Sequence, residues 1–105
     1  MSRAAYNTIG QDLAERHETT LGQLFSKPCL KLNGKAFAAF FQDEMVFKLG
    51  QAEVSLLKEK YIGSVNWDPS GKNRAMKDWI QIPSEFDEGW DALAMNAMEY
   101  VESNN

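Results

Sequence analysis

The sequence is poor in several features that would assign it to a particular class of protein. Cys29 and His17 are its only cysteine and histidine, so no internal disulfide and no usual structural zinc set can form. The longest apolar run, Ala36 to Phe41, is far shorter than the roughly 20 residues needed to span a bilayer. The N-terminus does not show the basic residues followed by an apolar stretch that are typical of a signal peptide. We expect a soluble, cytoplasmic protein without a membrane partner.

Positive charge is missing from the C-terminal part of the chain. Residues 84–105 contain six acidic residues and no lysine or arginine, whereas eleven basic and nine acidic residues precede them. The net charge is −4. Phosphate binding depends on the local concentration of Lys and Arg, so this total lowers the expectation of nucleic-acid binding without excluding it.

What is present is the composition of an ordinary globular domain. The 105 residues are 44% hydrophobic and 25% charged, which is enough for one core. We found no repeat, low-complexity tract or linker. The sequence therefore predicts a single domain, residues 1–105.

Local patterns predict three helices and an antiparallel sheet. Apolar residues at helical spacing predict a helix from Ser2 to about Arg16, a short helix around Val54 to Tyr61, and a final helix that Ser84 caps. Residues 19–25 are β-prone. Strands are predicted at 29–32, 35–41 and 45–49, around two tight turns, and a last strand at 79–82. The predicted fold class is two-layer α+β in the order α-β-β-β-α-β-β-α.

The turns set the expected strand register. Asn33-Gly34 is the typical pair of a type I′ hairpin turn, and we expect a second turn at Asp43-Glu44. Two-residue loops would then place Phe37 opposite Leu30, Phe41 opposite Val46, and Phe40 opposite Phe47. Both faces of this meander are largely apolar. The sheet should therefore be covered on both sides or meet a partner through one face.

No pattern predicts catalysis. Cys29 lies on an apolar strand without a nearby base, which is typical of a buried structural thiol. The segment from Asp68 matches neither a calcium loop nor a phosphate-binding loop, because Lys72 and Asn73 stand where those motifs require other residues. We expect no enzyme, no cofactor and no metal.

One loop carries the strongest candidate for binding. The segment DPSGKNRAMKDWIQIP, residues 68–83, places Lys72, Arg74 and Lys77 within six residues. These cations could grip an anionic partner such as DNA, or they could solvate the loop while Arg74 pairs with an aspartate. Trp67 is the tryptophan expected to be available for stacking on bases.

Three segments together resemble a known family. They are KPCLKLNGKAFAAFFQDEMVFKLG, the 68–83 loop, and WDALAMNAMEYV in the final helix. From about Gly22 to Val101 the chain resembles the N-terminal domain of TfoX/Sxy competence regulators, a YjbR-like family. The resemblance implies helices packed on an antiparallel sheet, a double-wing shape suited to DNA, and no catalytic residues.

The resemblance and the charges together give two hypotheses. In the first, the domain is a non-enzymatic regulatory module that acts through a protein partner or weak DNA contact. Its binding residues would be Lys72, Arg74 and Lys77, with Lys31 and Lys35 near the Asn33-Gly34 tip as a second wing. The alternative is an interaction module that pairs with another copy through the surplus apolar sheet face.

Overall fold

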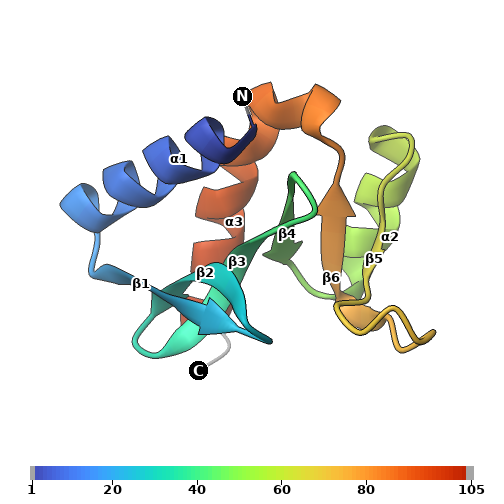
Figure 1. Cartoon of the computed structure of the whole chain (residues 1–105), viewed down its shortest axis with the longest axis horizontal. Coiled ribbons are helices and arrows are strands. Elements are labelled where there is room, and N and C mark those ends of the chain that lie inside the picture. The colour runs from blue at the N-terminus through green and yellow to red at the C-terminus, as the bar shows by residue number, and fades with distance from the viewer. Residues whose placement is uncertain (1, 104–105) are drawn as a thin grey trace.

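The computed structural model describes residues 2–103. In this range the chain forms an α+β fold of three α-helices, one 3-10 helix and one six-stranded antiparallel sheet (Figure 1). The helices are α1 (Ser2–Arg16), α2 (Gln51–Lys60), η1 (Ser84–Gly89) and α3 (Trp90–Ser103). The strands are β1 (Thr19–Leu24), β2 (Lys27–Leu32), β3 (Lys35–Phe41), β4 (Glu44–Lys48), β5 (Val65–Trp67) and β6 (Met76–Ile82).

The predicted fold class is confirmed, with one strand more than expected. The β-prone stretch after α1 pairs as β1 along β2, so four strands rather than three precede α2. The strand order across the sheet is β1-β2-β3-β4-β6-β5, which makes β1 and β5 the two edges. None of the helices formed by residues 2–103 has the length and apolar character needed to cross a bilayer.

The main core lies between the helices and one face of the sheet. The apolar stripe of α1, Tyr6, Ile9 and Leu13, is buried there as predicted. Helix α3 adds Trp90 and Val101 among its buried residues. The burial of both stripes against Phe47, Ile80 and other sheet residues explains why these segments fold as helices.

The start of the last helix differs from the prediction. Ser84 is the first residue of the 3-10 helix η1, and the N-cap is Pro83, which makes no side-chain capping hydrogen bond. Phe86 has φ −104° and ψ 22°, which is not helical, so the chain bends before α3 begins at Trp90. The predicted cap at Ser84 was therefore wrong.

Two local features overturn the predicted strand register. The β3–β4 loop is Gln42-Asp43, with φ of 52° and 67°, rather than Asp43-Glu44. Phe41 consequently pairs with Glu44, and Phe40 with Met45. A bulge beside Leu30 places Ala38 opposite that residue and leaves Phe37 as the extra residue of β3. Phe37 and Ala38 therefore both face the main core.

The other face of the sheet also carries buried apolar residues. A second core contains Cys29, Ala39, Phe41, Val46, Trp67 and Trp79, all buried within one chain. Phe25, just after edge strand β1, lies with its ring centroid 5.9 Å from that of Trp67 in edge strand β5. These apolar residues are therefore buried within the chain itself, without a helix over them. We call the side of the sheet that carries this second core the open face, because all the residues of this core come from strands.

Candidate binding site

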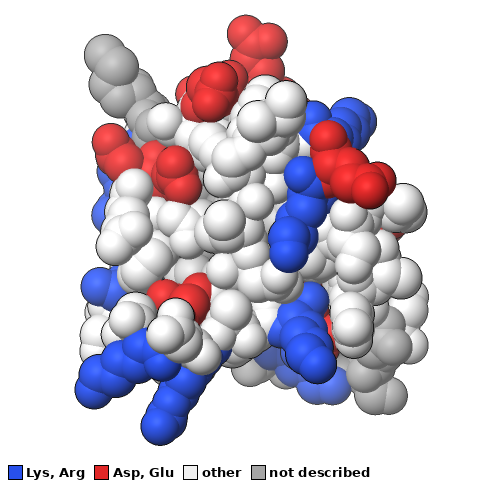
Figure 2. All heavy atoms as spheres, turned by 90° about the vertical axis from the view of Figure 1, so that its right-hand side faces the viewer, with Lys and Arg blue, Asp and Glu red and all other residues white. Residues whose placement is uncertain are grey.

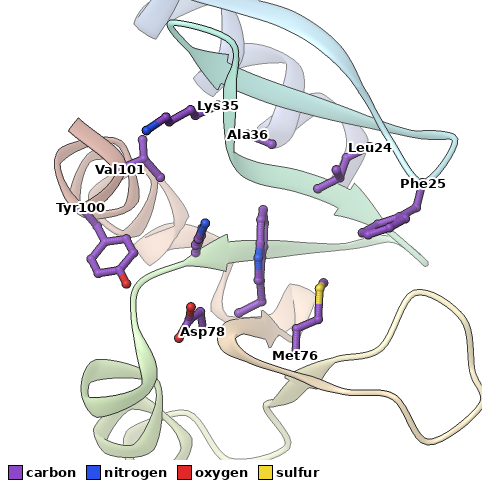
Figure 3. Close-up of a pocket in the computed structure, with 10 residues that line it drawn as sticks. Leu24, Phe25, Lys35, Ala36, Met76, Asp78, Tyr100 and Val101 are labelled. Carbon is purple, nitrogen blue, oxygen red and sulfur yellow. The ribbon is translucent and has the colours of Figure 1, made fainter. Parts of the chain in front are cut away.

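The open face is hollowed by a cleft of about 560 Å³. Side chains from five elements line it: Leu24 and Phe25 at the end of β1, Lys35 and Ala36 of β3, Lys48 of β4, Met76, Asp78 and Trp79 of β6, and Tyr100 and Val101 of α3. Figure 3 shows Lys35 beside Val101 on one side of the cleft and Phe25 on the opposite side. We call this hollow the main cleft.

A second hollow of about 300 Å³ adjoins the main cleft. Its lining contains Phe25 and Met76, which also line the main cleft, together with Pro69, Ser70 and Arg74 from the 68–75 loop. We call it the loop hollow. Phe25 and Met76 therefore form an apolar ridge between the two hollows. Cations lie on both sides of this ridge.

Positive charge dominates the lining of the two hollows. Lys35 and Arg74 are exposed, Lys48 and Asp78 are half-buried, and Asp78 is the only carboxylate among the lining residues. Within residues 2–103 the one ion pair joins Arg16 to Asp12 on α1, and neither residue lines the two hollows. The cleft cations therefore keep their charge available for a partner.

Asp68 holds the 68–75 loop in shape. Its Oδ1 accepts hydrogen bonds from the Ser70 hydroxyl at 2.7 Å and from the backbone N–H groups of Ser70 and Gly71, both at 3.1 Å. Its Oδ2 accepts one from the Arg74 backbone N–H at 3.0 Å. The Ser70 hydroxyl, followed by these N–H groups, lowers the pKa of Asp68 below its ordinary 3.8 against an opposing effect of burial.

The same geometry decides what Arg74 does. Asp68 contacts Arg74 through the backbone, and the guanidinium forms no ion pair with any described residue. The expectation that Arg74 pairs with Asp68 or Asp78 through its charge was therefore wrong. Its side chain instead lines the loop hollow.

The structure separates the five predicted binding residues. Lys35 lines the main cleft and Arg74 the loop hollow, whereas Lys72 and Lys77 are exposed and line neither. Lys31 is half-buried against Gly22 of β1, where an added Cβ would come within 3.0 Å of Lys31 Cε. In the view of Figure 2, the basic side chains lie in several groups, with uncharged or acidic surface between the groups. They do not form one continuous stripe there.

Trp67 is not available for stacking on bases, contrary to the sequence-based expectation. It is fully buried in the second core, with its ring centroid 5.0 Å from that of Trp79 and 5.7 Å from that of Phe41. The register of β5 could not be read from its three residues, so nothing in the sequence revealed which face Trp67 occupies. The indole takes part in packing instead.

Sequence reasoning missed Lys48 and Phe25 as site residues. Lys48 lies two positions after Val46 on β4, so strand alternation places it on the open face beside a residue of the second core. That signal was available. Phe25 carries no such signal, because its place depends on the contact with the far edge of the sheet.

Cys29 is fully buried, as predicted. Burial raises the pKa of its thiol, an effect that the positive charge of Lys31 partly offsets. Among residues 2–103, no group of three or more His, Cys, Asp or Glu side chains is arranged to hold a metal ion.

Comparisons with known proteins add no identity. No family model matches the chain, and neither a curated protein nor a solved structure matches it.

Proposed function

We propose that this chain is a non-enzymatic regulatory domain of the TfoX N-terminal type that binds an acidic segment of a protein partner on its open face. The observation that carries the proposal is the main cleft, in which Lys35 and Lys48 flank an apolar lining that includes Trp79. Such a surface suits a chain segment that carries both carboxylates and apolar side chains.

Charge supports an acidic partner. The whole chain has a net charge of −4, yet the two hollows gather three cations and one carboxylate. The hollows therefore carry an excess of positive charge, whereas the whole chain is negative. An acidic segment would be attracted to these three cations and repelled by the carboxylates elsewhere on the chain.

The arrangement favours a protein segment over duplex DNA. DNA binding depends on several cations that reach phosphates together, but Lys31 is half-buried, and Lys35 and Arg74 line different hollows. The second predicted wing, the Asn33-Gly34 tip, adjoins a hollow lined by the carboxylates Glu18, Glu99 and Glu102. These carboxylates would repel a phosphate backbone.

Burial of the second core also weakens the alternative of self-association through the apolar sheet face. Val46, Cys29 and Ala39 are 0% exposed in the single chain, so the surplus apolar face is already covered. A second copy would gain little apolar contact there.

A peptide selection tests the proposal. A random peptide library is selected on the wild-type protein and depleted on the Lys35→Glu/Lys48→Glu variant, which reverses the cleft charge. Both lysines have part of their surface in solvent, so the variant should fold. We expect recovered peptides rich in Asp and Glu that also carry a large apolar residue. Recovery of peptides without an acidic excess, or of none, would overturn the proposal.

Duplex DNA forms the second arm of this test. Anisotropy of a labelled duplex is measured at low and moderate salt with wild-type protein and with Lys72→Glu/Arg74→Glu. If Lys72, Arg74 and Lys77 each met a phosphate, the salt slope would be about −2.7. We expect weaker binding than for the selected peptides. If the protein binds DNA more tightly than the selected peptides and with that salt slope, the partner is nucleic acid and not a protein segment.

A further inference from the structure

Phe25 is held in an unusual place for a large apolar side chain. It is 57% exposed at the tip of the β1–β2 hairpin, and both loop residues, Phe25 and Ser26, have left-handed backbones with φ of 53° and 65°. The neighbouring hairpin uses Asn33-Gly34 for the same kind of turn, with φ of 52° and 81°. Asn-Gly is the favoured pair there, whereas a bulky residue in this conformation is an outlier.

The ring of Phe25 has a specific contact that accounts for its position. It lies at 69° to the Trp67 ring, an edge-to-face arrangement, with the centroids 5.9 Å apart. Trp67 in turn packs against Phe41 and Trp79. An aromatic ring at this point therefore completes a cluster whose other members are buried.

The same ring divides the binding surface. Phe25 lines both the main cleft and the loop hollow, and Figure 3 shows it projecting from the hairpin at the edge of the main cleft. Met76 is the other residue of the ridge, so a turn of the Phe25 ring would open part of the boundary between the two hollows. Lys35 and Lys48 would then lie on one side of the place that the ring leaves, and Arg74 on the other.

We propose that Phe25 fills, in the unbound chain, an aromatic subsite that receives a Phe or Trp side chain of the acidic segment. The incoming ring takes the place of the Phe25 ring against Trp67, while carboxylates beside it meet Lys35, Lys48 or Arg74. This inference rests on the proposed function, because it names the apolar residue that the acidic segment must carry. The Phe25 hairpin tip then acts as an internal competitor for the subsite.

The three tryptophans allow the subsite to be observed directly. Trp67 and Trp79 belong to the second core, whereas Trp90 lies in the main core and serves as an internal control. The indole N–H signals are followed by NMR after assignment with single Trp→Phe variants. The probes are N-acetylphenylalanine, N-acetylalanine, which lacks the ring, and N-acetylphenylalaninamide, which lacks the charge.

We expect N-acetylphenylalanine to shift the Trp67 signal and to leave the Trp90 signal in place. Removal of the internal competitor in Phe25→Ala should tighten its binding by about threefold to tenfold, because the subsite is then vacant in every molecule. N-acetylalanine should show no such gain. A second variant, Phe25→Asn/Ser26→Gly, removes the ring with residues suited to the turn, and should give the same gain with an intact hairpin.

Each outcome separates the subsite from the proposed function. An unchanged Trp67 signal, or equal affinity in wild type and both Phe25 variants, would overturn the aromatic subsite. If the ring binds as expected but N-acetylphenylalaninamide binds as tightly as the acid, and Lys35→Glu/Lys48→Glu has no effect, the subsite stands and the acidic partner fails.

Discussion

Phe25 and Trp67 belong to opposite margins of the sheet, yet their rings are in edge-to-face contact with centroids 5.9 Å apart. The contact follows from strong curling of the sheet, which brings β1 toward β5. Curling buries a second core without any helix over it. It also leaves the main cleft at the surface of that core, where cations and apolar side chains meet.

Trp67 should be a major contributor to stability. Its side chain is fully buried, so Trp67→Ala should lower the free energy of unfolding by about 3–5 kcal/mol. Val65, on the same strand, is 52% exposed, and Val65→Ala should change the free energy of unfolding by less than about 0.5 kcal/mol. Urea unfolding measures both. Similar small losses for the two variants would show that Trp67 is not packed in a core.

Gly50 should tolerate substitution less well than Gly34. Gly50 has φ 88° and ψ 150°, a conformation nearly restricted to glycine, and an added Cβ would lie 2.9 Å from Tyr100 Cε1. Gly34 also has a positive φ, but nothing lies within 4 Å of an added Cβ. We expect Gly50→Ala to cost about 1–3 kcal/mol from backbone strain plus the clash, and Gly34→Ala the strain alone. Thermal unfolding that ranks Gly34→Ala as the worse variant would contradict this geometry.

The shape of the 68–75 loop should depend on pH below the ordinary range of aspartate. Asp68 has a folded pKa below 3.8, so its ionised form stabilises the loop above that value, and this contribution is lost as the pH falls through the folded pKa. In an NMR titration, the amide signals of Gly71 and Arg74 should move with a midpoint below pH 3.8. A midpoint above 3.8 would show that the hydrogen bonds to Asp68 are absent.

Cys29 should be unreactive in the folded protein. Its side chain is 0% exposed and burial raises the pKa of the thiol, so little thiolate is present and none is accessible. An aromatic disulfide reagent, which releases a coloured thiolate when it reacts with a thiol, should react slowly with the native protein and rapidly with the denatured protein. Fast reaction in the native state would place Cys29 outside the second core.

Local signals predicted the parts of the fold that depend on near neighbours. The Asn33-Gly34 turn and the apolar stripe of α1 were read correctly because glycine conformation and helical spacing act within a few residues. The turns at Gln42-Asp43 and Phe25-Ser26 were not, since neither pair contains glycine although both take left-handed backbones. Tertiary packing overrides turn preference at these two places.

The site was predicted only in part for the same reason. Lys35 and Arg74 could be named because they stand out as cations beside turns. Their arrangement around two adjoining hollows depends on the curl of the sheet and on the extra residue Phe37, and both are long-range or irregular features. No pattern in the sequence shows that Arg74 lines the loop hollow whereas Lys72 does not.

The affinity of a selected acidic peptide for three proteins tests the central claim most directly. Fluorescence anisotropy compares wild type, Lys35→Glu/Lys48→Glu, and the control Lys72→Glu, whose residue is exposed outside both hollows. We predict that reversal of the cleft charge weakens binding by about tenfold or more, because like charges would then face each other, while Lys72→Glu changes it by less than about threefold. Equal affinity for all three proteins, or a larger loss with Lys72→Glu, would contradict binding in the cleft.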